Sequence, residues 1–266
     1  MLPVPESKVN PSSPLPLLAE TLELSFSDNG TGRPYLLLHG GAGPQSMRGL
    51  AAALQIGHRS IVPTHPGFAG KPRPDGFNRI SDLALAYLDL LDRLDLQEVV
   101  IVGNSVGGWI AAEMALRHSP RVAGIVLLNA CGIDTGSPTR QIVDPMKLAP
   151  ADRAALAFHD PARYAIAPNT PDALAEMIEN QSTLRIYAGE PFMHDPSLRA
   201  RLSQMPVPSL IVWGESDGIV DIAYGQRFAA AMPHARFESI AQAGHFPHIE
   251  QLDKVVALIE DFRRGA

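Results

Sequence analysis

The sequence predicts an α/β fold, with a mostly parallel central sheet, helices on both faces and one helical insertion. Short aliphatic runs of the kind found in buried strands alternate with amphipathic helical stretches, and this alternation is typical of a parallel sheet covered on both faces. The alternation stops between about residues 134 and 206, where prolines separate helical pieces, and then resumes. A single α/β domain interrupted by a helical insertion accounts for both observations.

Local patterns place the elements that precede the insertion. Leu22, Leu24 and Phe26 alternate with polar residues and predict a strand with one buried face, and residues 28–30 (Asp-Asn-Gly) predict a turn after it. Apolar residues at spacings of three and four predict a helix over 80–94. Further buried strands are expected at 35–39, 60–63, 99–102 and 122–129, and further helices at 46–54 and 109–116.

The remaining elements complete the organisation of the chain. The clearest helical stretch of the insertion covers residues 172–184; afterwards strands are expected at 209–213 and 236–240, and helices at 222–232 and 251–263. We therefore assign residues 21–133 and 207–266 to the α/β core and residues 134–206 to a helical cap or lid. Residues 1–20 are rich in proline and serine, and we expect them to form a loose arm.

Composition and charge exclude several classes of function. The 266 residues can bury a full core, and 45% hydrophobic with 19% charged residues is typical of a soluble globular protein. A net charge of −6 argues against nucleic acid or an anionic membrane as partner, and no apolar run is long enough to cross a bilayer. The first residues lack the pattern of a signal peptide. We therefore expect a cytoplasmic protein that acts on a small molecule, in an oligomeric state that the sequence leaves open.

The single cysteine, Cys131, excludes an internal disulfide and fits a reducing compartment. It lies at the end of an apolar run, between Ala130 and Gly132, so we expect a buried and inert thiol. No histidines or cysteines have the spacing of metal ligands, and the sequence contains no cofactor fingerprint. We therefore expect neither a metal nor a cofactor.

Ser105 lies in the stretch Gly-Asn-Ser-Val-Gly-Gly (residues 103–108), where the chain must turn from a strand into a helix within a few residues. Glycine tolerates the close backbone approach and strained dihedral angles that such a turn requires. A serine at the apex of the turn is held out for chemistry, although a serine that only caps the following helix would fit the same stretch.

Four of the predicted strands end in unusual residues, at the edge of the sheet where ligands bind in such folds. The strand at 35–39 ends in His39-Gly-Gly-Ala-Gly43, and the strand at 99–102 ends in the Ser105 turn. The strand at 209–213 is followed by Gly-Glu-Ser-Asp217, and the strand at 236–240 leads into Ala-Gly-His245. A nucleophile, an acid and a base are thus expected at one edge of the sheet, in the chain order Ser, Asp, His.

In these motifs the chain resembles the α/β-hydrolase superfamily, among its serine-nucleophile members with a helical cap. Gly-Asn-Ser-Val-Gly, His-Gly-Gly-Ala-Gly, His-Pro-Gly-Phe, Gly-Glu-Ser-Asp and Ala-Gly-His follow the order of the family, and the resemblance covers nearly all of the chain after about Thr21. The family often has Asp where Thr64 stands and Gly where Ala69 stands. These departures bear on loop packing and leave the three chemical positions intact.

The resemblance implies a role for each of the three residues. Ser105 would be the nucleophile, His245 the base that activates it, and Asp217 the acid that orients the imidazole. His248 competes with His245, but only His245 follows glycine at the family position, and we expect His248 at the surface or at a pocket rim. Asp221 competes with Asp217, but it precedes a predicted helix and is expected to be its N-cap.

The resemblance also implies an oxyanion hole made of two backbone N–H groups. One would come from Val106, the residue after the nucleophile, and the other from Gly41 or from Ala42. His39 is expected to brace this loop, and residues 64–68 to form a turn that shapes the site. Trp109 and Met114 are expected to pack the helix that follows Ser105.

These residues predict hydrolysis of an ester, thioester or related acyl bond through a serine acyl-enzyme. Dehalogenases and epoxide hydrolases of this fold use Asp as nucleophile and are therefore disfavoured. Hydrolases that cleave a carbon–carbon bond in meta-cleavage products keep Ser in a very similar turn and are the alternative. That group usually has Trp where Phe246 stands and a cap arginine for the substrate carboxylate. Arg185 could fill that role, although an arginine in an amphipathic helix is usually solvated.

Two further activities fit the same motifs. Cofactor-free haloperoxidase or perhydrolase chemistry uses the same three residues, and a ligand-binding receptor can retain all of them. The insertion is expected to select the substrate by enclosing a mostly apolar pocket of limited volume, which disfavours long lipids. The apolar positions behind this expectation are Leu156, Phe158, Ile166, Leu174, Met177 and Ile178.

Overall fold

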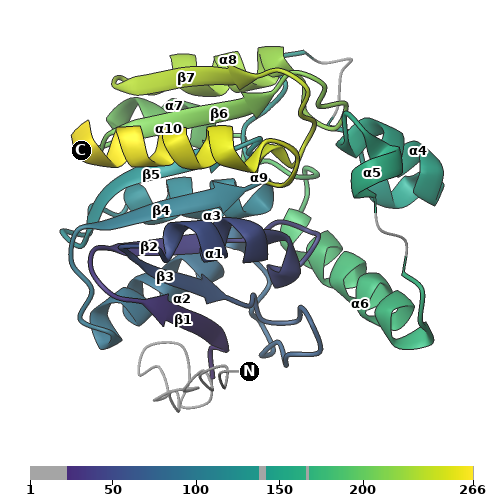
Figure 1. Ribbon diagram of the computed structural model, residues 1–266, viewed down its shortest axis with the longest axis horizontal. Helices are drawn as coiled ribbons and strands as arrows, with labels where there is room; N and C mark the ends of the chain where they lie inside the picture. Colours follow the sequence, from purple (N-terminus) through teal and green to yellow (C-terminus); the bar gives the residue numbers. More distant parts are fainter. Residues whose placement is uncertain (1–22, 138–141, 166–167, 266) are drawn as a thin grey trace, which may run out of the picture.

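The computed structural model describes residues 23–137, 142–165 and 168–265. Its seven strands form one sheet in the order β1-β3-β2-β4-β5-β6-β7, with helices on both faces (Figure 1). The strands are β1 Phe26–Gly30, β2 Pro34–Leu38, β3 Arg59–Pro63, β4 Val99–Asn104, β5 Val122–Leu128, β6 Ser209–Gly214 and β7 Ala235–Ile240. The arm expected over residues 1–20, and also Leu22 and Ile166, lie outside the described residues.

The sheet is parallel except at one edge. β1 pairs with β3 in antiparallel register, and every other neighbouring pair is parallel. The prediction of a mostly parallel sheet with helices on both faces is therefore confirmed.

The prediction of a turn at residues 28–30 is wrong, because β1 continues through these residues. Asp28 lies opposite Ile61 in the antiparallel pair. The Arg59 guanidinium donates two hydrogen bonds to the Asp28 carboxylate, at 2.9 and 2.7 Å. A residue type typical of turns is thus retained in a strand by a cross-strand ion pair, which local sequence patterns do not register.

Helices cover the sheet on two sides because side chains alternate along each strand. Tyr35 and Leu37 point to one face, packed by α1 Arg48–Leu54, which follows the 3₁₀ turn η1 Pro44–Met47, and by α10 Leu252–Gly265, which follows α9 Pro247–Glu250. Leu36 and Leu38 point to the other, covered by α2 Ile80–Arg93, α3 Val106–Ala115 and α8 Ile222–Ala230. Trp109 in α3 is buried in this second layer, as expected, and so is Met114.

The elements in the described part of the segment between β5 and β6 are helical, apart from an isolated β-bridge that joins Gly132 to His194. The helical elements are η2 Pro145–Lys147, α4 Pro150–Ala157, α5 Pro161–Tyr164, α6 Pro171–Ala188, α7 Leu198–Arg201 and η3 Leu202–Gln204. The first four begin at a proline, which suits the first turn of a helix because no N–H is needed there. α4, α5 and α6 lie beyond one end of the sheet (Figure 1). Among the described residues, none of the helices has the length and apolar character that would let it cross a membrane.

The expectation that Leu174 and Ile178 line an enclosed pocket is wrong. These residues are 45% and 53% exposed on α6. The buried face of α6 is instead formed toward its carboxyl end by Thr183, Leu184 and Tyr187. These residues repeat at helical spacing on a different side of the helix, because the inward face of α6 is set by its contacts with the core.

A test of the packing at the start of α3 uses Gly107. A Cβ added at Gly107 would lie 2.2 Å from the carbonyl oxygen of Leu38, so α3 would have to move away from the sheet. We expect Gly107→Ala to lower the free energy of unfolding by about 1–3 kcal/mol or more, measured by urea denaturation. Gly49→Ala in α1 is the control, because its Cβ would meet only Leu252 Cδ2, at 3.9 Å. It should be neutral or stabilising by up to about 1 kcal/mol, and equal losses in both variants would contradict the packing argument.

Candidate active site

Ser105 lies at the apex of a strained turn between β4 and α3. Its backbone has φ 55° and ψ −121°, a conformation that costs a residue other than glycine on the order of 1–3 kcal/mol. A Cβ at Gly103 would lie 2.2 Å from the carbonyl oxygen of Gly107, so the turn closes only with glycine there. Ser105 stands at the N-cap position of α3, yet its side chain makes no capping hydrogen bond. Helix capping therefore does not explain this serine.

His39 and His65 brace the loop that lies against Ser105. The site for a Cβ on Gly40 is only 2.9 Å from Ser105 Cβ, so residues 39–43 pack directly on the serine. His39 Nδ1–H donates to the carbonyl oxygen of Gly40 at 2.7 Å, and His39 Nε2 accepts from the N–H of His65 at 3.0 Å. The two rings stack with centroids 3.7 Å apart. Burial lowers the pKa of His65 to about 4 and that of His39 well below its usual value, so both rings are neutral at pH 7.

Asp217 and His245 form a buried hydrogen-bonded pair at the ends of β6 and β7. His245 Nδ1 lies 2.8 Å from Asp217 Oδ2, and each residue is 6% exposed. The other carboxylate oxygen, Oδ1, accepts from the N–H groups of Ile219 at 2.8 Å and Val220 at 3.2 Å. Because an ionised carboxylate only accepts, His245 Nδ1 carries the ring proton and Nε2 is left as the acceptor.

Two asparagines that the sequence analysis did not single out as site residues connect these strand ends. Asn129 Nδ2 donates to Asp217 Oδ2 at 2.7 Å, and its Oδ1 accepts from the N–H of Gly214 at 3.1 Å. Asn104, next to Ser105, donates from Nδ2 to the carbonyl oxygen of His245 at 2.9 Å. Asn104 is the last residue of β4 and Asn129 directly follows β5, and an amide side chain at the end of a buried apolar run is the signal that could have indicated them.

The predicted oxyanion-hole residues lie beside the Ser105 turn. Val106 is the first residue of α3, so its N–H has no acceptor within the helix. Gly41 is half-buried, and Leu184 Cδ2 of α6 lies 2.5 Å from where its Cβ would be, so a larger residue there would have to displace the Leu184 side chain. Ala42, the alternative donor, is exposed.

Polar side chains attach α6 to the turn after β3. Thr183 Oγ1 donates to the carbonyl oxygen of Gly67 at 2.7 Å, and Tyr187 Oη donates to that of Pro66 at 3.0 Å. The N–H of Ala69 donates to Asn180 Oδ1 at 2.8 Å. The turn at residues 64–68 was expected to shape the site. Together with Ala69 it provides the backbone groups to which α6 is hydrogen-bonded.

The end of α4 contacts the loops that carry Asp217 and His245. The N–H of His245 donates to the carbonyl oxygen of Ala157 at 2.7 Å, and the N–H of Gly218 donates to that of Leu156 at 2.9 Å. The ring of Phe246 stacks on that of Phe158, with centroids 5.2 Å apart. The segment between β5 and β6 therefore contacts the turn after β3 and the loop at residues 39–43 through α6, and the acid and base loops through α4.

The alternative candidates for the base and the acid, His248 and Asp221, have other roles in the structure. His248, expected at the surface or at a pocket rim, is 1% exposed, which corrects that expectation: α9 turns it inward. Asp221 accepts from the N–H of Tyr224 at 2.8 Å and caps α8, as expected. Arg185 makes its ion pair away from Ser105, Asp217 and His245: its side chain is 59% exposed and lies 3.5 Å from the Asp144 carboxylate.

Cys131 is buried, and burial raises the pKa of its thiol to about 12, so it stays protonated.

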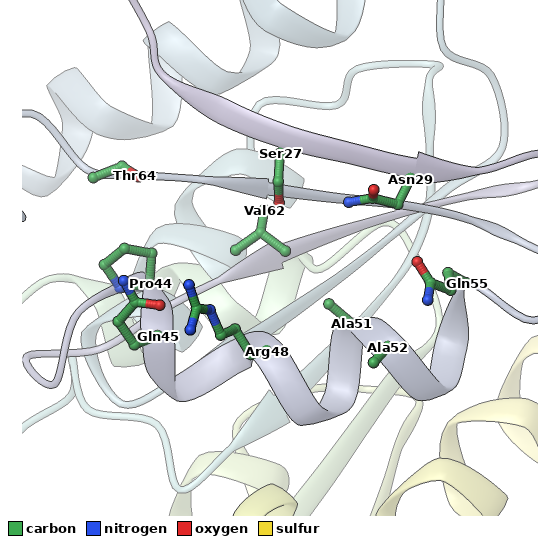
Figure 2. A pocket seen from close by; sticks show the side chains of 10 residues that line it. All are labelled: Ser27, Asn29, Pro44, Gln45, Arg48, Ala51, Ala52, Gln55, Val62 and Thr64. Carbon is green, nitrogen blue, oxygen red and sulfur yellow. The ribbon is translucent and has the colours of Figure 1, made fainter. Parts of the chain in front are cut away.

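A groove of about 360 Å³ lies elsewhere on the molecule (Figure 2). It runs between α1 and the edge of the sheet formed by β1 and β3, and Arg48 reaches into it. It is lined by Ser27, Asn29, Pro44, Gln45, Arg48, Ala51, Ala52, Gln55, Val62 and Thr64, none of which belongs to the cluster around Ser105. Within residues 23–137, 142–165 and 168–265, no group of three His, Cys, Asp or Glu side chains is placed to hold a metal ion.

The burial of His248 as a neutral imidazole can be tested through the pH dependence of stability. Neither of its ring nitrogens has a hydrogen-bond partner among the described residues, and burial, with a smaller effect of His245, lowers its pKa to about 3. A histidine in the unfolded chain has a pKa near 6.5. Between about pH 3 and pH 6.5 the unfolded chain therefore binds about one proton more than the folded chain, and the free energy of unfolding falls as the pH falls through this window. We expect wild type to lose about 2 kcal/mol more than His248→Leu between pH 7.5 and pH 5 in urea denaturation. Equal losses would show that the ring is not buried in its neutral form.

Comparisons with known proteins identify the family of this chain. The sequence model of the alpha/beta hydrolase family matches residues 35–258. The 2-hydroxymuconate semialdehyde hydrolase of Pseudomonas putida is 29% identical over 92% of this chain and 92% of the relative. The pimeloyl-acyl-carrier-protein methyl ester esterase of Aromatoleum aromaticum is 28% identical over 88% of this chain and 99% of the relative.

Solved structures show the same fold. A meta-cleavage product hydrolase from Pseudomonas fluorescens IP01 superposes with a TM-score of 0.75 at 22% identity, covering 91% of this chain and 94% of that chain. The family match begins in β2, ends in α10 and contains Ser105, Asp217 and His245. The fold that the motifs predicted is confirmed, and the chain belongs to the alpha/beta hydrolase family.

Proposed function

We propose that Ser105, His245 and Asp217 act as a catalytic triad that hydrolyses an ester or related acyl bond of a small, mostly apolar substrate. The hydrogen bond between His245 and Asp217 carries this proposal, because it leaves the imidazole with its free nitrogen available as a base. The strained and uncapped Ser105 supports it, because neither property benefits the stability of the fold.

The proposed reaction has two steps. His245 Nε2 takes the proton of Ser105 Oγ as that oxygen attacks the carbonyl carbon, and Asp217 stabilises the imidazolium that forms. The N–H groups of Val106 and Gly41 stabilise the oxyanion, and its collapse expels the alcohol, which receives the proton from His245. Water then attacks the acyl-enzyme with His245 again as base, releasing the acid and free Ser105.

We further propose that residues 134–206 act as a cap that selects the substrate. The contacts of α6 with residues 66–69 and of α4 with residues 218 and 245 support this role, since residues 218 and 245 belong to the loops of the proposed acid and base. Phe246, Phe158 and Leu184 supply apolar surface near it. A small uncharged molecule suits these surroundings, and the single buried thiol suits a cytoplasmic location.

Hydrolysis of a carbon–carbon bond is the second candidate. It is favoured by the relatives, several of which are named as hydrolases of 2-hydroxymuconate semialdehyde or of 2-hydroxy-6-oxononadienedioate. It is disfavoured by Arg185, whose side chain is 59% exposed and lies 3.5 Å from the Asp144 carboxylate, so its charge already has a partner in this chain. Phe246, where those enzymes usually have Trp, also disfavours carbon–carbon hydrolysis.

Asparagine substitutions distinguish the two candidate acids. Asp217→Asn replaces the acceptor of the imidazole proton by an amide, which should lower kcat by on the order of 10⁴-fold. Asp221→Asn keeps a good N-cap side chain and should change the stability by about 1 kcal/mol or less, with kcat unchanged. Both are measured with p-nitrophenyl acetate. An inactive Asp221→Asn beside an active Asp217→Asn would show that the wrong acid has been chosen.

A substrate panel tests the proposed activity. We expect multiple turnovers of p-nitrophenyl acetate or butyrate, little hydrolysis of long-chain triglycerides, and loss of activity in Ser105→Ala. A strong preference for a 2-hydroxy-6-oxo-dienoate, impaired selectively by Arg185→Ala, would place carbon–carbon hydrolysis first. Rapid hydrolysis of emulsified triglyceride would contradict an enclosing cap. Binding of substrate without multiple turnovers would indicate a receptor.

A further inference from the structure

Glu250 is a buried carboxylate that the proposed mechanism does not use. It is the last residue of α9, five positions after His245, and only 7% exposed. Its Oε2 accepts from the N–H of Gly244 at 2.6 Å. Its Oε1 accepts from the N–H groups of His159 at 2.9 Å and Asp160 at 3.0 Å. One carboxylate thus joins the loop that carries the proposed base to the junction between α4 and α5.

The backbone of His245 is held by a short series of such bonds. The N–H of Gly244 is held by Glu250, the N–H of His245 by the carbonyl oxygen of Ala157, and the carbonyl oxygen of His245 by Asn104. Two of these three bonds depend on the α4–α5 junction or on the carboxylate that binds it. The position of the imidazole is therefore coupled to the packing of this junction against the core.

A carboxylate is the group that this site requires. Three N–H groups converge on Glu250, and an ionised carboxylate can only accept hydrogen bonds. A glutamine of the same length would present an NH₂ group toward at least one of these donors, leaving that backbone N–H unpaired in a buried place. The bond to Gly244, at 2.6 Å, is short for an N–H donor, and hydrogen bonds to an ionised acceptor are shorter than those between neutral groups.

We propose that Glu250 is a positioning residue for His245, and that it makes the alignment of the base depend on the docking of the α4–α5 junction. The inference rests on the proposed role of His245. Glu250 touches no reacting atom, and its effect is transmitted through the backbone of residues 244 and 245 and through the N–H groups of residues 159 and 160. Misalignment of a catalytic group by about 1 Å can cost on the order of 100-fold in rate.

The test compares Glu250→Gln with a matched control, Glu113→Gln. Glu113 is also a buried glutamate, 6% exposed, but it lies in α3 and pairs with Arg201 at 2.6 Å and Arg117 at 3.0 Å. We measure kcat and KM for p-nitrophenyl butyrate, with active sites counted by fluorophosphonate titration so that unfolded protein does not contribute. Glu250→Gln should lower kcat per site by roughly 10- to 100-fold with KM changed less than about twofold. Glu113→Gln should lose stability and keep the wild-type kcat per site.

Amide hydrogen exchange provides a second readout. In Glu250→Gln, exchange should rise together in residues 157–160 and 243–246, while the α6 residues 180–187 keep their wild-type protection. Glu250→Asp keeps a carboxylate on a shorter side chain and should give an intermediate kcat. If Glu250→Gln does not fold, Glu250→Asp carries the same comparison.

Several outcomes would overturn the proposal. A wild-type kcat per site in Glu250→Gln, or in Glu250→Asp where only that variant folds, would show that the carboxylate does not position the base. An equal fall in Glu113→Gln would show a general effect of losing a buried charge, and increased exchange in only one of the two segments would refute the coupling. If Ser105→Ala and His245→Ala keep their activity, the proposed function itself is wrong, and this outcome is independent of Glu250.

Discussion

The close packing of α3 against the ends of β2 and β4 is the constraint on which the rest of the structure depends. A Cβ on Gly103 would lie 2.2 Å from the carbonyl oxygen of Gly107, and a Cβ on Gly107 would lie 2.2 Å from that of Leu38. This contact forces Ser105 into a strained conformation and places it beside the loop at residues 39–43. A turn of this kind is rigid because the surrounding sheet over-determines it, and rigidity is what a nucleophile held in one orientation needs.

Buried polar groups at the strand ends then satisfy one another. Asn129, Asp217 and His245 form one connected set of hydrogen bonds, and Asn104 ties the residue next to Ser105 to the backbone of His245. A buried polar group without a partner would cost more than the bonds return, so such a network specifies one arrangement of its loops. Asn104 Oδ1 and the two ring nitrogens of His248 are exceptions in this region, since they have no hydrogen-bond partner among the described residues.

The segment between β5 and β6 is held to the core in two chemically different ways. α6 is attached by side chains, through Asn180, Thr183 and Tyr187, to the turn after β3. The end of α4 is attached mainly by backbone groups and by Glu250, next to the proposed acid and base. Substitutions on α6 can therefore alter the surface that covers the site with less effect on the geometry of His245. A change at the α4–α5 junction would instead alter mainly the geometry of His245.

The sequence by itself determined the alternating strands and helices, the glycine turn around Ser105 and the order of Ser, Asp and His along the chain. These features depend on hydrophobic periodicity and on glycine, which act over a few neighbouring residues. Only the tertiary structure decided the partners of Glu250, which lies 91 residues along the chain from His159, and the inward orientation of His248. It also decided that Leu174 and Ile178 face outward and that residues 28–30 stay in a strand. The physical reason is that a side chain's face and partners depend on how whole elements pack, and that packing joins residues far apart in the sequence.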